Sequence, residues 1–493
     1  MRWSQGRAAQ PTLAANRALY ECLRQVILDG SLPAGAQLPP SRELAATLGV
    51  SRNTTVHAYG QLVAEGYVRS LTGSGTFVNH VLPEQVLWSH RGRDGAAPAR
   101  AAKTTRLSVR GERLVAGALA SSVQWGAFMP GVPDVTAFPH RKLQQLAARW
   151  QRKLPPHWLS YATGGGHPAL RSAIAQHLRQ ARSVSCEADQ VIVTSGVHQA
   201  VDLVARVLTD PGDRVWMEEP GYWGLRGVLS VNGLDIEPVP VDSEGMQVPS
   251  EAGAAPRLVL VTPSHQYPLG AVMSLARRAA LIEHARQCNA WILEDDYDSE
   301  FRFAGHPIPS LQGLATDAPV IYVGTFSKTL YPGLRIAYLV LPRELIKPMR
   351  TAHAELYREG QLVMQAALAD FIEHGHYAAH IRRMRLVYAS RRAALLSLIE
   401  HWLGPEWIHP FDSAAGLHVV LRLPPGMDDQ KLAGKAAKLG VHVRPLSRYY
   451  AQPGAVSGLL LGFGGVDASG MLAPFETLVR CIREARRTAT HQR

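Results

Sequence analysis

Four short apolar runs constrain the fold of this 493-residue chain more than any other feature. They are residues 190–194, 257–261, 290–293 and 320–323, and helical patterns lie between them. Near-continuous apolar strands are typical of a sheet that helices cover on both faces. Most of the runs are followed by Gly, Ser, Thr or Asp, which places polar groups at the carboxyl ends of the strands, where open α/β sheets bind ligands. We therefore predict an α/β domain over residues 123–493 with a site at that edge.

The length and composition suit a multi-domain globular protein. A chain of this size corresponds to roughly two to four compact units. Its hydrophobic fraction is 46%, and no apolar stretch approaches the ~18 residues of a membrane span. The N-terminus has no apolar segment of the kind a secretory signal needs, so we expect a cytoplasmic protein with no membrane partner. The four cysteines lie far apart without a Cys-x-x-Cys pair, which favours free thiols over disulfides or a thiolate metal site.

The first 80 residues contain three helical patterns with the spacing of a helix-turn-helix. Gly49 permits a left-handed turn after the second pattern, and Ser51 can cap the third. In this arrangement the N-terminal residues of the third helix face the major groove of double-stranded DNA. The expected contacts to bases or phosphates are Arg42, Arg52, Asn53, Thr54 and Thr55.

Apolar spacing predicts which face of each helix is buried. In the first helix the stripe repeats every four residues, and similar stripes follow in the second and third helices. The predicted buried residues are Leu19, Leu23 and Ile27, then Leu44, Ala45 and Leu48, then Val56, Tyr59 and Val63.

Two short extended runs, residues 67–69 and 75–78, predict a two-stranded wing, and Gly73 and Gly75 at its turn are further expected DNA contacts. Residues 1–120 hold 14 Lys and Arg against 7 Asp and Glu. That imbalance favours a polyanionic partner, although a basic solvated face is the alternative explanation for charge alone.

The run Leu38–Ala45, together with Val50–Val56, Glu65–Tyr67 and Gly73–Val78, resembles the GntR family of winged-helix regulators. The resemblance covers residues 13–78 and implies a DNA-binding domain over residues 1–80. The chain departs from the family at Thr55, where an apolar residue is more usual after Thr54. Residues 81–122 are rich in Ala, Arg and Gly without sustained periodicity, and we interpret them as a linker.

Lys328 follows the last apolar strand and lies 33 residues after Asp295, which itself follows a strand. Thr325 and Ser327 offer hydroxyls beside the lysine, and Arg335 offers a guanidinium fork. Pyridoxal phosphate requires an amine for a Schiff base, an acid for its ring nitrogen and a cradle for its phosphate. This set of residues therefore predicts a site for that cofactor.

Further candidates surround the ring and the phosphate. Tyr297 can bond the ring hydroxyl, and Tyr222 can stack on the ring, with a core aromatic as the alternative. The backbone amides of Ser195, Gly196 and Val197 open a helix and can receive the phosphate. Residues 294–298 are also open to interpretation as an acidic magnesium cluster, but no second hard-oxygen motif accompanies them, and we expect no metal.

Residues 194–199, 219–222, 262–270, 294–301 and 324–335 resemble, in this order, the motifs of fold-type-I aminotransferases. Joined to a GntR-like winged helix, they resemble the MocR family of transcriptional regulators, which includes GabR-, TauR- and PdxR-like groups. The resemblance implies an internal aldimine at Lys328, a ring-nitrogen contact from Asp295, and phosphate contacts from Thr325, Ser327 and Arg335. It also implies a head-to-tail homodimer.

Two departures from the aminotransferase pattern concern the ligand. Tyr267 stands before Pro268 where an asparagine usually binds the ring hydroxyl, so the partner of that hydroxyl stays open. The C-terminal arginine that commonly clamps a substrate carboxylate is missing from the run Leu459–Phe463. Arg444 or Arg448 can replace it, and a surface charge is the alternative for each.

The leading hypothesis is a transcriptional regulator that binds pyridoxal phosphate and senses it, or an amino compound that reacts with it, through an aldimine at Lys328. The alternative is a competent aminotransferase with an accessory DNA-binding domain, against which the missing clamp counts. The two hypotheses differ in whether an amino acid and a keto acid are interconverted over many turnovers.

Overall fold

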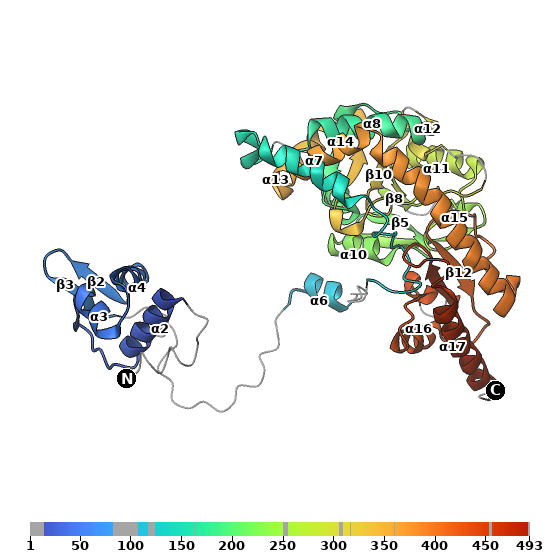
Figure 1. Ribbon diagram of the computed structural model, residues 1–493. Helices are drawn as coiled ribbons and strands as arrows, with labels where there is room; N and C mark the ends of the chain where they lie inside the picture. Colours follow the sequence, from blue (N-terminus) through green and yellow to red (C-terminus); the bar gives the residue numbers. More distant parts are fainter. Residues whose placement is uncertain are drawn as a thin grey trace. The chain divides into compact units, whose positions relative to one another are not determined.

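The computed structural model describes residues 14–81, 107–116, 124–162, 164–249, 255–304, 309–315, 317–358, 360–452 and 456–491. The chain divides into two compact units, Met1–Thr105 and Arg106–Arg493 (Figure 1). Across the described part of the chain, none of the helices combines the length and the apolar character that crossing a membrane requires.

The N-terminal unit is a winged helix-turn-helix. Three helices pack on a small sheet of strand order β1-β3-β2, in which β2 and β3 form the predicted wing. The sheet is antiparallel throughout. The elements are α2 (Ala15–Leu28), β1 (Gln37–Leu38), α3 (Ser41–Leu48), α4 (Arg52–Ala64), β2 (Val68–Leu71) and β3 (Gly75–Val78).

The predicted helix boundaries of this unit are confirmed. Gly49 ends α3 in the left-handed conformation, with φ of 63°. The side chain of Ser51 accepts a hydrogen bond from the amide of Thr54 at 3.1 Å and so caps α4. The predicted stripe of the first helix is also confirmed, because Leu19, Leu23 and Ile27 are buried.

The predicted buried face of the third helix is confirmed at Tyr59 but wrong at Val56 and Val63. Val56 and Val63 are 49% and 39% exposed. The buried face instead passes through Thr55, Ala58, Tyr59 and Leu62. Threonine counts as polar in an apolar pattern, yet its β-branched side chain fits a core position, and this shifted the interpretation of the helix face.

The second unit contains an eight-stranded sheet of order β4-β11-β10-β9-β8-β5-β6-β7. Strands β10, β9, β8, β5 and β6 run parallel, while β11 pairs antiparallel with both β10 and β4. All four predicted strands belong to this sheet. The strands are β4 (Val191–Thr194), β5 (Arg214–Glu219), β6 (Asp235–Asp242), β7 (Gly245–Met246), β8 (Leu258–Val261), β9 (Trp291–Asp296), β10 (Val320–Thr325) and β11 (Ala337–Val340).

Helices cover both faces of this sheet, as predicted (Figure 1). Alternate residues of each strand face opposite sides. Leu258 and Leu293, for example, pack with α9 and α10 on one face, whereas Val259 and Ile292 pack with α11 on the other. The helices are α7 (His140–Arg152), α8 (Pro168–Ala181), α9 (Val197–Leu208), α10 (Trp223–Val231), α11 (Leu275–Cys288), α12 (Leu311–Leu314), α13 (Ile346–Tyr357) and α14 (Leu362–Glu373).

The C-terminal part of the same unit has a smaller antiparallel sheet of order β12-β14-β13. Its core is continuous with that of α7, α8 and α14 through residues such as Phe128, Phe463 and Phe475. The elements are α15 (His376–Trp402), β12 (His418–Arg422), α16 (Asp429–Lys438), β13 (Arg444–Pro445), β14 (Gly458–Gly462) and α17 (Leu472–His491).

Most of the predicted linker, residues 81–122, lies outside the described residues. Within it, α6 (Val109–Ala116) is a helix that lies against α10. The linker boundaries stay a prediction.

Candidate cofactor site and DNA-reading module

Lys328 lies just beyond β10, at the carboxyl edge of the large sheet. Its Nζ atom donates a hydrogen bond to the carbonyl oxygen of Gly131 at 2.8 Å. Burial lowers the pKa of Lys328, and the nearby carboxyl groups of Asp298 and Asp295 oppose that shift. An amine whose pKa is lowered is more often neutral, and a neutral amine is the form that attacks a carbonyl carbon.

Asp295 lies on β9, the strand beside β10, and its side chain is buried. Its Oδ1 atom is buried without a hydrogen-bond partner. Burial, and after it the charge of Asp296, raise the pKa of Asp295 to about 7, and Lys328 opposes both effects. A buried carboxyl without a partner destabilises a fold unless a ligand satisfies it. This atom fits the protonated ring nitrogen of pyridoxal phosphate.

The other acidic side chains of residues 294–298 point to separate partners. Glu294 accepts hydrogen bonds from the amides of Leu311 and Gln312, whereas Asp298 contacts His265. Within the described residues, no three His, Cys, Asp or Glu side chains converge as a metal site requires. The geometry therefore favours distinct structural roles for these acids over a shared magnesium ion.

Aromatic side chains enclose the space around Asp295 and Lys328. The hydroxyl of Tyr297 lies 2.8 Å from Nδ1 of His265, and that of Tyr267 lies 3.1 Å from the hydroxyl of Tyr449. The rings of Tyr267 and Tyr222 meet edge to face with centroids 5.8 Å apart. The structure thus brings together the three predicted ring contacts, Tyr222, Tyr267 and Tyr297.

The predicted phosphate residues also converge. Gly196 precedes α9 with φ of 111°, and no side chain caps that helix, so its first amides are available to an anion. The amide of Ser195, in contrast, already donates a hydrogen bond to Oε1 of Gln199 at 2.5 Å. Arg335 donates from Nη2 to the carbonyl oxygen of Ser195 at 2.8 Å, and a Cβ atom at Gly196 would collide with its guanidinium. Thr325 and Ser327 lie at the end of β10, with their hydroxyls 3.1 Å apart.

Arg444 lies on β13 of the smaller sheet, whereas Arg448 lies in the 3-10 turn Leu446–Tyr449 that follows it. Arg444 on β13 is the direct antiparallel partner of Leu460 on β14. Opposed residues of antiparallel strands project to the same side, and Leu460 packs with Tyr449 beside Tyr267. Arg448 instead places its guanidinium carbon 5.8 Å from the ring centre of Trp223.

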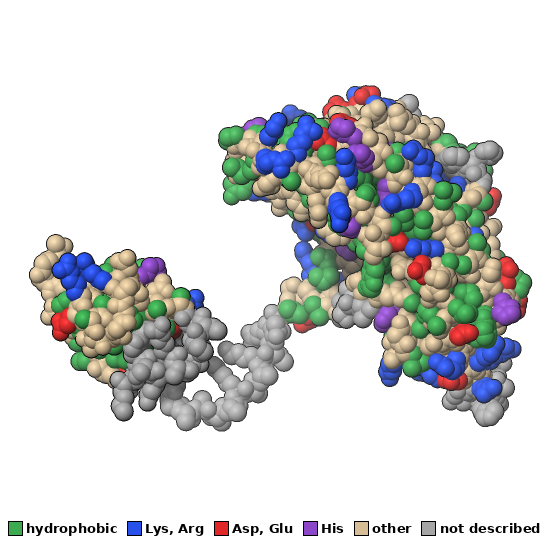
Figure 2. Space-filling model, viewed as in Figure 1, with side chains coloured by type: hydrophobic (Ala, Val, Ile, Leu, Met, Phe, Trp, Pro, Cys, Tyr) green, Lys and Arg blue, Asp and Glu red, His purple; other side chains and the backbone are tan. Residues whose placement is uncertain are grey.

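In the N-terminal unit, most predicted DNA contacts are accessible. Arg42, Arg52 and Asn53 are exposed, and Thr54 is half-buried. Gly73 and Gly75 have φ of 79° and 119°, which the turn of the wing requires. Figure 2 shows Lys and Arg side chains on the visible face of this unit. Thr55 contradicts the prediction, because its side chain is fully buried in the helix packing and cannot reach DNA.

Both parts of the chain match families of known proteins. Residues 15–78 match the family described as bacterial regulatory proteins, gntR family, and residues 135–457 match aminotransferase class I and II. The chain is 41% identical to the probable rhizopine catabolism regulatory protein MocR of Rhizobium meliloti, over 92% of this chain and 91% of that protein.

The chain belongs to the MocR family of transcriptional regulators.

Other members of the MocR family match with similar coverage. The pyridoxine biosynthesis regulator PdxR of Corynebacterium glutamicum is 34% identical over 91% of this chain and 92% of its own. Among solved structures, the kynurenine aminotransferase of Pyrococcus horikoshii has a TM-score of 0.67 and 28% identity, over 77% of this chain and 95% of its own. The match to aminotransferase class I and II and the similarity to solved aminotransferases indicate that the cofactor of this domain is pyridoxal phosphate.

The sequence did not indicate three residues of this MocR-family site, Gly131, His265 and Tyr449, or Arg182, which lies outside the pocket and contacts Asp296. His265 follows a predicted strand by four residues, a position that the rule of strand carboxyl ends could have selected. Gly131 and Arg182 carry no local signal, because their contacts with Lys328 and Asp296 span 197 and 114 residues of sequence.

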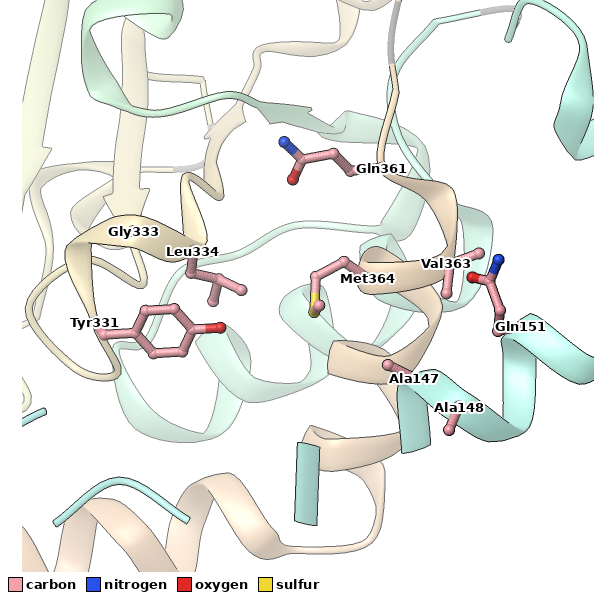
Figure 3. Close-up of a pocket in the computed structure, with 9 residues that line it drawn as sticks. All are labelled: Ala147, Ala148, Gln151, Tyr331, Gly333, Leu334, Gln361, Val363 and Met364. Carbon is pink, nitrogen blue, oxygen red and sulfur yellow. The ribbon is translucent and has the colours of Figure 1, made fainter. Parts of the chain in front are cut away.

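A cavity of about 500 Å³ lies beside the loop that carries Arg335. Tyr331 and Leu334 of that loop face Met364 of α14 across it, and Ala147 of α7 closes one side (Figure 3). Because its lining is mainly apolar and omits Lys328 and Asp295, this cavity is a neighbour of the cofactor site and not part of it.

Proposed function

We propose that this regulator senses pyridoxal phosphate, or an amino compound that reacts with it, through the amine of Lys328, and alters DNA binding in the cytoplasm. The proposal rests on one observation: the amine of Lys328 lies near the buried carboxyl of Asp295, whose Oδ1 atom has no hydrogen-bond partner, in a chain that also contains a winged helix. Ligand sensing explains why a regulator contains a cofactor pocket.

Each residue has a proposed role in holding the cofactor. Pyridoxal phosphate supplies an aldehyde that reacts reversibly with amines and a ring that withdraws electrons. Lys328 provides the amine, and Asp295 keeps a proton on the ring nitrogen. Tyr222 covers the ring, and Tyr267 or Tyr297 contacts the ring hydroxyl. The phosphate contacts are Thr325, Ser327, Arg335 and the amides of Ser195, Gly196 and Val197.

Arg444 is the better supported of the two candidates for an effector's acidic group. It shares a sheet face with Leu460, which packs beside Tyr449 and Tyr267. Burial raises the pKa of both tyrosines, and the charge of Arg444 opposes that rise at Tyr267 and at Tyr449, where Arg448 also opposes it. Arg448 lies over Trp223, and we assign it a secondary role.

Sensing requires that the ligand favour one arrangement of the DNA-binding domains. A ligand with equal affinity for both arrangements shifts nothing, and reversing a 1:99 equilibrium takes about 5.5 kcal/mol of preference. A change of partner at Lys328, which now bonds Gly131, is a local event that can provide such a preference.

We also propose a head-to-tail homodimer. Large apolar side chains at the surface of the second unit support a protein interface, since Leu159 and Tyr161 are each 75% exposed. Two winged helices in one dimer would address two half-sites through Arg42, Arg52, Asn53, Thr54, Gly73 and Gly75. Sedimentation at micromolar concentration tests this proposal, and a monomer would contradict it.

A working aminotransferase is the second candidate, favoured by the match to aminotransferase class I and II over residues 135–457. The absence of an arginine from residues 459–463 counts against it. Sustained conversion of an amino acid and a keto acid at about 1 per second or more would establish the enzyme. A single half-reaction without further turnover would favour the regulator over the enzyme.

The test of the regulator is binding to the DNA upstream of its own gene, with and without pyridoxal phosphate and a panel of amino acids. We expect the affinity or the footprint to change with ligand in the wild-type protein and to stay constant in Lys328→Ala. Ligand-independent binding in both proteins would contradict sensing.

A further inference from the structure

A buried arginine outside the cofactor pocket connects the elements that build it. Arg182 follows α8 and is 7% exposed. Its Nε atom lies 2.8 Å from Oδ2 of Asp296, and its Nη2 atom donates to the hydroxyl of Ser264 at 2.7 Å. Asp296 is the residue after Asp295 on β9, and Ser264 is the residue before His265. One guanidinium therefore ties together the strand and the turn that face the cofactor.

Asp295 and Asp296 face opposite sides of the sheet because side chains alternate along a strand. Asp296 also accepts a hydrogen bond from the hydroxyl of Tyr322 at 2.6 Å. Both donors bond Oδ2 of Asp296, whereas Oδ1 of Asp296 and Oδ1 of Asp295 are each buried without a partner. The two adjacent carboxyl groups therefore differ in that Asp296 is engaged within the protein through one oxygen by an arginine and a tyrosine.

We propose that Arg182 is a positioning residue for the cofactor: by pairing with Asp296 and holding Ser264, it leaves the charge of Asp295 free for the ring nitrogen. This inference rests on the role proposed above for Asp295. Arg182 does not touch the cofactor in this scheme, and it acts through Asp296 and the 264–267 turn.

The surrounding charges make Arg182 the main compensation for Asp296. The groups that face Asp295 are Glu218, Asp298, Lys328, Tyr222 and Tyr297, besides Asp296 itself. Those that face Asp296 are Arg182, Tyr322, Tyr338, Glu294, Glu300, Arg278 and Arg302. Of these cations, Arg182 is the one that the structure places in an ion pair with Asp296, whereas Arg278 bonds backbone carbonyl oxygens.

Opposite single substitutions test the pairing. Arg182→Met leaves Asp296 beside Asp295 without its cation, so the two carboxyl groups compete for one ionisation. Asp296→Asn leaves the cation without its anion and favours the ionised form of Asp295. The midpoint of the pH dependence of cofactor binding should therefore rise in the first variant and fall in the second, and the double variant should return toward wild type.

The measurement is titration of the full-length protein with pyridoxal phosphate across pH 5.5–9, followed by the visible absorption of the bound cofactor. At a pH well below both midpoints we expect about tenfold weaker binding in Arg182→Met, the change that a pKa shift of one unit gives, and about fivefold weaker binding at the wild-type midpoint. Arg182→Lys keeps the cation and should keep the midpoint.

Two results would overturn the proposal: unchanged midpoints in both single variants, or shifts of both in the same direction, as a general loss of packing would produce. If Arg182→Met does not fold, Asp296→Asn decides by itself, since its midpoint must fall. Failure of the wild-type protein to bind the cofactor at any pH would instead contradict the proposed function.

Discussion

Arg444 on β13 lies directly opposite Leu460 on β14, and Leu460 packs in one apolar cluster with Tyr449. This register places a cation beside the aromatic wall of the cofactor pocket, although the run Leu459–Phe463 has none. We predict that Arg444→Met removes the response of DNA binding to an amino compound with an acidic group. The loss should correspond to about 1.5–3 kcal/mol, as for a hydrogen bond to a charged group.

The matched control for that experiment is Arg448→Met, which removes a nearby cation of the same kind that lies over Trp223. Effector titration of both variants by DNA-binding assay should show a larger loss for Arg444. Equal losses in the two variants would show that the position of Arg444 opposite Leu460 does not determine which arginine binds the acidic group of the effector.

Asp295 should make the cofactor-free protein less stable at high pH. Burial and Asp296 raise its pKa to about 7, so the folded protein keeps a proton that the unfolded chain loses near pH 4. Its contribution to stability therefore falls as the pH rises from about 4 to 7 and is lost above that range. We predict that Asp295→Asn raises the free energy of unfolding at pH 8 by about 4 kcal/mol.

Denaturant unfolding of the cofactor-free protein at pH 5 and pH 8 checks this prediction. The gain from Asp295→Asn should be small at pH 5 and large at pH 8, and pyridoxal phosphate should no longer stabilise the variant. Asp235→Asn, at an exposed position of β6, is the control. A gain that is the same at both pH values would contradict a raised pKa.

Three substitutions near the starts of α3 and α4 test how the N-terminal unit contacts DNA. Thr55 is fully buried and its hydroxyl has no hydrogen-bond partner, so Thr55→Val should leave DNA affinity unchanged.

Asn53 is exposed at the start of α4, and as a base contact its replacement in Asn53→Ala should cost about 1–3 kcal/mol of binding free energy on the specific site. Arg42→Ala should weaken binding to all sequences and reduce the salt slope by about 1.

Fluorescence anisotropy with specific and unrelated duplexes at several salt concentrations distinguishes these three variants. Loss of affinity in Thr55→Val with an intact thermal transition would show that α4 presents a different face to DNA.

Local sequence logic located much of the site, because Asp295 and Thr325 end apolar strands and Gly196 opens a helix. The same logic failed for α4, where a buried Thr55 and an exposed Val56 reverse the usual pattern. It could not find the bond between Lys328 and Gly131 or the pair of Arg182 and Asp296, which depend on the packing of distant segments. The register of β13 and β14 likewise becomes visible only in the folded sheet.

We propose that the amine of Lys328 couples the cofactor pocket to DNA binding. Its most direct test is the binding of wild-type protein and Lys328→Ala to the upstream DNA, each titrated with pyridoxal phosphate and with amino compounds. Ligand-dependent affinity in the wild type that is absent from Lys328→Ala, with both proteins folded and equally able to bind DNA without ligand, is the predicted result. The same ligand response in both proteins would contradict the account.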